Sequence, residues 1–212
     1  METTPKHEQR AFSFEIRAER NEKYGAYITG RPIVYNSKTD MGYFDEIIQN
    51  GALDGANLRD VRFLVNHDTS MIPLARSRNN NENSTMQMTV DDSGMNIRVN
   101  LDVENNATAK ELYSAVERGD IDGMSFMFDI DGEEWDGMET DHPTRTITKI
   151  GNVYEVSAVT FPAYEDTEIS VRSKATLDNA RRTLDSVERS TPDGVNDNLI
   201  NLEHEKLKLL TM

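Results

Sequence analysis

Apolar and polar residues alternate over much of the first 160 positions, which is the pattern of half-buried β-strands. The clearest case is 95–103, where Met95, Ile97, Val99 and Leu101 share one face. The segment 95–103, together with the strand expected at 85–90 and the turn at 91–94, predicts a hairpin. Further strands are expected at 11–19, 25–36, 61–67, 123–130, 144–150 and 153–161, with a bend or bulge at Gly30 and Pro32.

Helical periodicity is strongest from Thr108 to Arg118, where Thr108 and Glu111 form a capping-box pair and Gly119 follows the last turn. Shorter or weaker helical patterns occur at 44–52 and 198–210, and an acidic loop is expected at 131–141. Many short strands and one dominant helix predict a mainly β fold, an antiparallel β-barrel surrounded by a few α-helices.

The composition changes after Ser173, where charged residues increase and large apolar residues become rare. This change predicts three parts: a disordered N-terminus at 1–10, one folded domain at 11–172, and a partly helical tail at 173–212.

Composition and charge narrow the function classes. The chain has 38 acidic and 23 basic residues and a formal net charge of -15, which disfavours binding to nucleic acid and to anionic membranes. It has no cysteine, which excludes disulfides, thiolate catalysis and cysteine-ligated metals. The polar first ten residues do not look like a signal peptide, and no apolar run is long enough for a membrane span.

Without cysteine, covalent catalysis would use a hydroxyl, a lysine or a carboxylate, and a serine needs a base to take its proton. The chain has four histidines. His67 ends an apolar strand, whereas His7 and His204 lie near the termini and His142 lies in the acidic loop. His67 is therefore the preferred base, because a strand end can hold its ring in place.

Ser125 is the matching nucleophile, because it follows the glycine-rich turn between helix and strand. Ser157 is a rival, although its position in an alternating strand favours an ordinary sheet-facing hydroxyl.

A third residue should accept a hydrogen bond from the imidazole and fix its tautomer. Glu155 is a candidate, because a carboxylate among strand-forming valines is either buried with a partner or exposed to solvent, and its spacing favours exposure as the simpler interpretation. Asp68 is disfavoured because successive strand residues point to opposite faces, and His142 remains the second choice.

A metal site is a weaker interpretation. His67 and Asp68 could meet the acidic loop, but that loop lacks the EF-hand spacing and the chain has no HExxH motif. No metal site and no cofactor are therefore predicted.

Four blocks of the sequence, spanning most of 11–172, resemble the tailed-phage prohead serine proteases. In order, they are YNS with FDEIIQNGAL, VRFLVNHD, RGDIDGMSFMF and VYEVSAVTFPAY. The second block carries His67 and the third carries Ser125, in the order expected for that family.

The resemblance implies that His67 is the general base, Ser125 the nucleophile and Glu155 the orienting carboxylate. The family is similar in fold to herpesvirus assembly proteases, which are β-barrels surrounded by helices and use a second histidine as the third residue. That likeness keeps His142 as an alternative. The chain departs from the family around Ser125, where Met124, Phe126 and Met127 stand in place of small residues.

The implied activity is a serine endopeptidase that cleaves capsid-assembly proteins, scaffold or coat, and itself during prohead maturation. Its expected partners are the phage major capsid protein with its scaffold segment, and self-association is left open. The expected location is the assembling prohead in the host cytoplasm. The alternative is a catalytically inactive assembly or scaffolding factor of the same fold.

Overall fold

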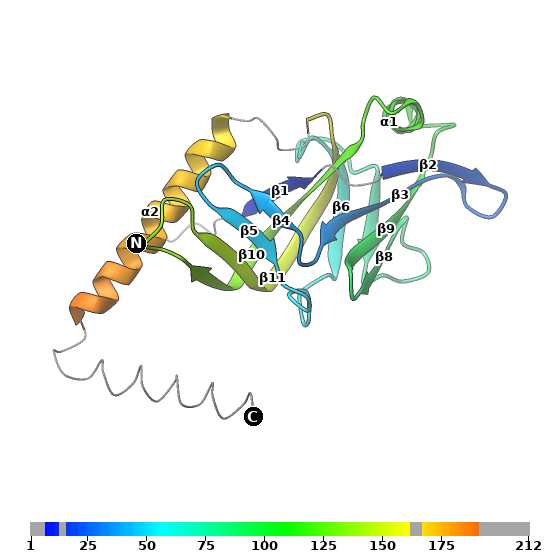
Figure 1. Ribbon diagram of the computed structural model, residues 1–212. Helices are drawn as coiled ribbons and strands as arrows, with labels where there is room; N and C mark the ends of the chain where they lie inside the picture. The colour runs from blue at the N-terminus through cyan, green and yellow to red at the C-terminus, as the bar shows by residue number, and fades with distance from the viewer. Residues whose placement is uncertain (1–6, 13–15, 162–166, 191–212) are drawn as a thin grey trace.

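The computed structural model describes residues 7–12, 16–161 and 167–190, which form two β-sheets and two helices (Figure 1). In chain order the strands are β1 (Glu8–Phe12), β2 (Ile16–Asn21), β3 (Gly25–Val34), β4 (Lys38–Asp40), β5 (Asp45–Ile48), β6 (Asp60–Val65), β7 (Ala75–Arg78), β8 (Met86–Asp91), β9 (Gly94–Leu101), β10 (Gly123–Asp136) and β11 (Thr144–Val159). The helices are α1 (Ala107–Arg118), between β9 and β10, and α2 (Thr167–Ser190), after β11. None of the helices among the described residues is long and apolar enough to cross a membrane.

The larger sheet has seven strands and is organised around β11. Its main order is β1-β10-β11-β5-β4, and β6 also pairs with β11 and carries β7 on its other side. The first residues of β11 pair with β5 and its last residues pair with β6, both in parallel, while β10 pairs antiparallel along its length. The smaller sheet has the order β2-β3-β9-β8 and is antiparallel.

The mainly β class with helices is confirmed. Among the described strands, however, the pairings form two separate sheets and do not close into a barrel, so the predicted closed barrel is not confirmed. The expected bulge in β3 is present as a register shift between Gly30 and Ile33.

The main core lies between the two sheets, where β10 packs near β3. Phe126 and Phe128 of β10 stack in this core with ring centroids 4.6 Å apart. Helix α1 packs against β2 and β3, burying Ala109, Leu112 and Val116, the face expected from its periodicity. The core therefore supports the β10 segment that carries Ser125 from the side of the smaller sheet.

The N-terminus of α1 differs from the expected capping box. Asn106 is the N-cap, and its side-chain oxygen accepts a hydrogen bond from the backbone N–H of Ala109. Asparagine is as good a cap as serine or threonine, and the helix begins one residue before Thr108. The C-terminus agrees with the prediction, since Gly119 caps the helix in the left-handed conformation.

Three segments of the larger sheet correct the sequence-based expectations. The segment 44–52 contains β5 in place of a helix, because Asp45–Ile48 pairs with the start of β11. The expected acidic loop at 131–141 is largely the second half of β10. The two strands expected at 144–150 and 153–161 form the single strand β11. Strand β5 depends on pairing with the distant residues 144–147, and the other two segments depend on the long β10–β11 hairpin, whose extent local patterns do not report.

Both ends of the domain also differ from expectation. Glu8–Phe12 forms β1 in place of a disordered start, because it pairs with β10. Helix α2 crosses the predicted boundary between 172 and 173, and its Leu177 packs against Met41 and Phe44. Figure 1 shows α2 along the opposite flank of the molecule from α1. The helix predicted at 198–210 lies outside the described residues.

A buried ion network joins four strands of the larger sheet. Glu46 of β5 is 2% exposed and accepts hydrogen bonds from Arg10 of β1 and Arg145 of β11, both also buried. Arg145 bonds in turn to Glu133 of β10. Buried charges are tolerated only when paired in this way.

Glu46→Gln should therefore destabilise the protein, because two buried guanidinium groups lose their shared counter-ion. We expect the free energy of unfolding in urea to fall by about 3 kcal/mol, the lower end for breaking a buried pair. The loss is limited because Arg10 keeps Glu8, 2.8 Å away, and Arg145 keeps Glu133. Glu104→Gln is the matched control, because the Glu104–Arg20 pair is exposed and such pairs contribute little. Equal effects of the two substitutions would contradict a stabilising role for the buried network.

Candidate active site

The turn after β6 holds His67 in an unusual backbone conformation. Asn66 and His67 have φ angles of 51° and 57°, in the left-handed region that non-glycine residues rarely adopt. The side chain of Asn66 fixes the turn, since it accepts a hydrogen bond from the N–H of Thr160 at 2.9 Å and donates to the Thr160 hydroxyl at 3.0 Å. Consecutive left-handed residues held by neighbouring structure are often found at functional sites.

The imidazole of His67 contacts a buried carboxylate. Its Nδ1 lies 2.5 Å from Oε1 of Glu155, whose side chain is 3% exposed, whereas the His67 side chain is 18% exposed. Glu155 lies on β11 directly between Arg62 of β6 and Met127 of β10. The structure thus brings together two residues that are 88 positions apart, and Glu155 takes the buried, partnered alternative of the two left open by the sequence.

Ser157 completes this arrangement, which the sequence did not predict. Its hydroxyl donates a hydrogen bond of 2.5 Å to Oε2 of Glu155 and accepts one of 3.1 Å from the backbone N–H of His67. Ser157 is fully buried. It therefore holds both the carboxylate and the backbone of the histidine. The sequence did contain a signal for this contact, because residues two apart on a strand, such as Glu155 and Ser157, have side chains on the same face.

Ser125 lies on the neighbouring strand, facing the same side of the sheet. It is directly opposite Ser157 in the antiparallel β10–β11 pair, and opposed residues project from the same face. Ser125 is 1% exposed, and its hydroxyl donates a 2.8 Å hydrogen bond to the backbone carbonyl of Arg10. A hydroxyl has one hydrogen, so in this arrangement it is directed at β1 and not at His67.

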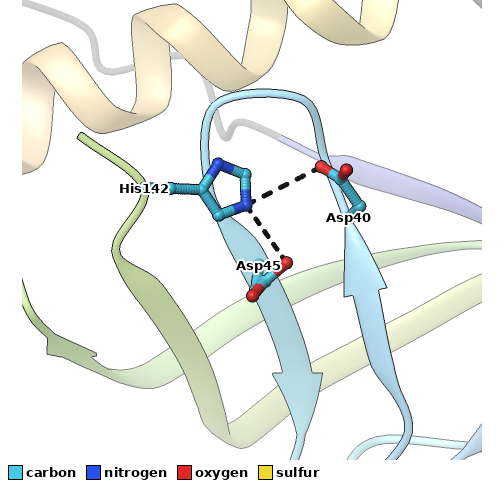
Figure 2. A group of neighbouring side chains, drawn as sticks. All are labelled: Asp40, Asp45 and His142. Atoms are coloured by element: carbon cyan, nitrogen blue, oxygen red, sulfur yellow. Dashed lines mark hydrogen bonds and ion pairs between the residues drawn. The ribbon is translucent and has the colours of Figure 1, made fainter. Parts of the chain in front are cut away.

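His142 lies at the other end of β11. It precedes the first residue of that strand, and its Nε2 is 3.1 Å from Asp45 and 3.8 Å from Asp40 (Figure 2). Glu155, by contrast, is among the last five residues of β11. The structure therefore places His142 with β4 and β5, apart from His67.

The group of Asp40, Asp45 and His142 is the one set of potential metal ligands within the described ranges. Lys38 already forms a 2.6 Å ion pair with Asp45. Hydrogen bonding from Lys38, opposed by burial and helped by His142, lowers the pKa of Asp45. These contacts identify a partly exposed ion-pair cluster. Asp68 is not part of it, since its carboxylate bonds to Ser70 in the turn after His67.

The contacts of the site are those required of a base held by a carboxylate. When Nδ1–H donates to Glu155, the tautomer is fixed and Nε2 is left as the proton acceptor. Glu155 can then stabilise the imidazolium that forms. The remaining requirement is a hydroxyl that can reach Nε2, and Ser125 is on the adjoining strand of the same face.

A protein-family model matches most of the chain. The family model described as caudovirus prohead serine protease matches residues 12–182, which include His67, Ser125 and Glu155. No curated protein and no solved structure matches the chain significantly. With a match over most of its length and a histidine–carboxylate pair beside a strand serine, this chain belongs to the caudovirus prohead serine protease family.

Proposed function

We propose that the chain is a serine endopeptidase in which Ser125 is the nucleophile, His67 the general base and Glu155 the residue that orients the base. The observation that carries the proposal is the buried contact between His67 Nδ1 and Glu155. A histidine used only for packing has no need of a buried carboxylate, and such a carboxylate costs free energy unless it is paired.

The reaction would follow the general course of acyl transfer by serine. The Oγ–H proton of Ser125 moves to Nε2 of His67 as Oγ bonds to the carbonyl carbon of the substrate. The C–N bond then breaks, and His67 returns the proton to the leaving amine. Water, activated by the same base, releases the acyl group and regenerates Ser125. Glu155 stays ionised and stabilises the imidazolium in both steps.

The substrates proposed are capsid-assembly proteins, either the scaffold segment or the coat protein, together with the chain itself. This rests on the family, whose members are described as prohead proteases. The enzyme would act inside the assembling prohead in the host cytoplasm, with the major capsid protein as partner. The tail after Ser173 is the proposed site of self-cleavage.

Replacing either reacting residue should abolish cleavage. On co-expression with the major capsid protein of its phage, we expect the native chain to cut the capsid protein or its own tail. Ser125→Ala and His67→Ala should produce no cut. The first removes the oxygen that bonds to the substrate carbonyl carbon, and the second removes the nitrogen that accepts the proton. Intact-mass spectrometry of the purified proteins measures this directly. Normal cutting by either variant would show that the residue concerned has no catalytic role.

Glu155→Gln tests the orienting role. The amide cannot stabilise an imidazolium and can favour the wrong tautomer, so we expect the acylation rate to fall by roughly 10²- to 10⁴-fold. Circular dichroism and the unfolding midpoint should show that the fold is retained. Turnover close to native would assign the third role elsewhere.

Ser157→Ala tests whether this hydroxyl positions Glu155. The substitution removes the hydrogen bond to the Glu155 carboxylate and the acceptor of the His67 N–H. We therefore expect turnover to slow by about tenfold, with a smaller effect on KM, because substrate contacts are not removed. Ser77→Ala is the matched control. Ser77 is equally buried, on β7, and its hydroxyl has no hydrogen-bond partner among the described residues. If both variants slow the reaction equally, the effect is one of packing.

A second candidate function is a catalytically inactive assembly factor of the same fold. One observation favours it: Ser125 is buried and its hydroxyl is directed at Arg10. This candidate predicts that shells assemble equally well with native protein and with Ser125→Ala, and that neither sample contains cut capsid protein. Cutting by the native protein alone would exclude it.

A further inference from the structure

We propose that β1 is an autoinhibitory strand, which occupies the place of an extended substrate peptide along β10 and covers Ser125. The inference rests on the proposed function, since it takes Ser125 as the nucleophile. It adds to that function the binding mode of the substrate and a way of keeping the enzyme silent.

The register of β1 supports this directly. β1 pairs antiparallel with residues 124–128 of β10, and Ala11 is directly opposite Ser125. The hydroxyl of Ser125 donates to the carbonyl of Arg10, the peptide group that joins Arg10 to Ala11. A substrate peptide that paired in the same register would present a backbone carbonyl to Ser125 at the same place.

With β1 in place, the nucleophile cannot react. Ser125 is 1% exposed, so a substrate cannot approach its oxygen. Its only hydrogen is directed at Arg10, whereas general-base catalysis requires that hydrogen to be directed at His67. Displacement of β1 would remove the carbonyl that contacts the Ser125 oxygen, which opens that side of the oxygen and frees the hydroxyl to rotate.

Specific side chains, outside the β1–β10 backbone ladder, hold β1 in place. The Arg10 guanidinium forms two hydrogen bonds with Glu46, one of them 2.7 Å long, and Nδ1 of His7 lies 2.8 Å from Asp129. Burial works against the charge of Arg10, but the proximity and hydrogen bonding of Glu46 raise the pKa of Arg10 above its usual value. Side-chain contacts thus hold the chain at residue 7, just before β1, and at Arg10 within it.

The rest of the protein can accommodate loss of β1. β1 is the edge strand of the larger sheet, so its release interrupts one ladder and leaves β10 with its partner β11. Glu46 would keep Arg145, which bonds to it at 3.2 Å. The family match begins at residue 12, so four of the five residues of β1 precede the segment shared with other prohead proteases.

The exposed β10 edge would bind a peptide by adding a strand. An unpaired strand edge offers backbone N–H and C=O groups to any extended segment, largely independent of its sequence. The substrate class is therefore an extended, locally unfolded segment of a capsid-assembly protein. Inhibition is relieved when such a segment, at the high local concentration inside a shell, replaces β1.

A reversible cross-link tests the inference on the full chain. The native protein has no cysteine, and Gln9 and Met127 are half-buried, directly opposed residues of β1 and β10. Opposed positions of an antiparallel pair lie within disulfide range. The double variant Gln9→Cys/Met127→Cys would therefore lock β1 when oxidised and release it when reduced.

The readout is the rate at which a fluorophosphonate probe labels Ser125. The oxidised variant should label at least about tenfold more slowly than the same variant reduced, since the lock removes the open state that reacts. The matched control is Thr89→Cys/Asn96→Cys, an opposed pair on β8 and β9, where oxidation should not change the rate. Arg10→Ala should label at least about tenfold faster than the native chain, because it loses a buried ion pair that holds β1 closed.

The outcomes separate this inference from the proposed function. Equal labelling of the oxidised and reduced lock, with Ser125→Ala unlabelled, would overturn the autoinhibitory role and leave Ser125 as the nucleophile. No labelling of any folded variant, reduced or oxidised, would overturn the proposed function and this inference with it. If Arg10→Ala does not fold, the comparison of the oxidised and reduced Gln9→Cys/Met127→Cys variant still tests the inference, because that variant retains Arg10.

Discussion

The pairing of β11 with β10 on one side and with β6 on the other is the constraint on which the candidate active site depends. β11 carries Glu155 and Ser157, β10 carries Ser125, and the turn after β6 carries His67. Because side chains of adjacent strands at the same level project from one face, the β10–β11 pairing puts Ser125 on the same face as Glu155 and Ser157. The β6–β11 pairing, with the turn fixed by Asn66 and Thr160, brings His67 to them. A slip of one residue in either pairing would move its members to the opposite face.

Two glutamates of the larger sheet are buried, and each needs partners to compensate its charge. Glu155 and Glu46 are both 2% exposed, and each is held by more than one partner. Glu46 is satisfied by two arginines and joins β1, β5 and β11 in an ion network. Glu155 is satisfied by the imidazole of His67 and the hydroxyl of Ser157. The first arrangement stabilises the sheet, and the second suits acid–base chemistry.

The position of β1 connects these two sites. Arg10 bonds to Glu46 through its side chain and accepts the hydroxyl of Ser125 through its carbonyl. The ion network that stabilises the larger sheet therefore also holds the strand that covers the serine. A protease assembled together with its substrates would benefit from such an arrangement, because premature cleavage would remove scaffold before the shell is complete.

The sequence by itself determined the mainly β class, α1 with its Gly119 cap, the hairpin of β8 and β9, and the bulge in β3. It also singled out His67, Ser125 and Glu155, through blocks resembling those of a protease family. Each of these features depends on local periodicity, on turn residues or on a short motif, and each such signal lies within one short segment of the chain. Strand β5 was misjudged as a helix, and β1 as disordered, because what stabilises them is pairing with residues about 100 positions away.

Only the tertiary structure decided which partner each catalytic candidate has. His142 and His67 lie at opposite ends of β11, and His142 contacts Asp40 and Asp45. The tertiary structure also showed that Ser157, which alternation alone marks as a sheet-facing hydroxyl, bonds to Glu155 and His67, and that Ser125 is directed at β1. The physical reason is that hydrogen bonds between side chains depend on strand register and on the direction of each side chain, and neither is contained in a local pattern of residues.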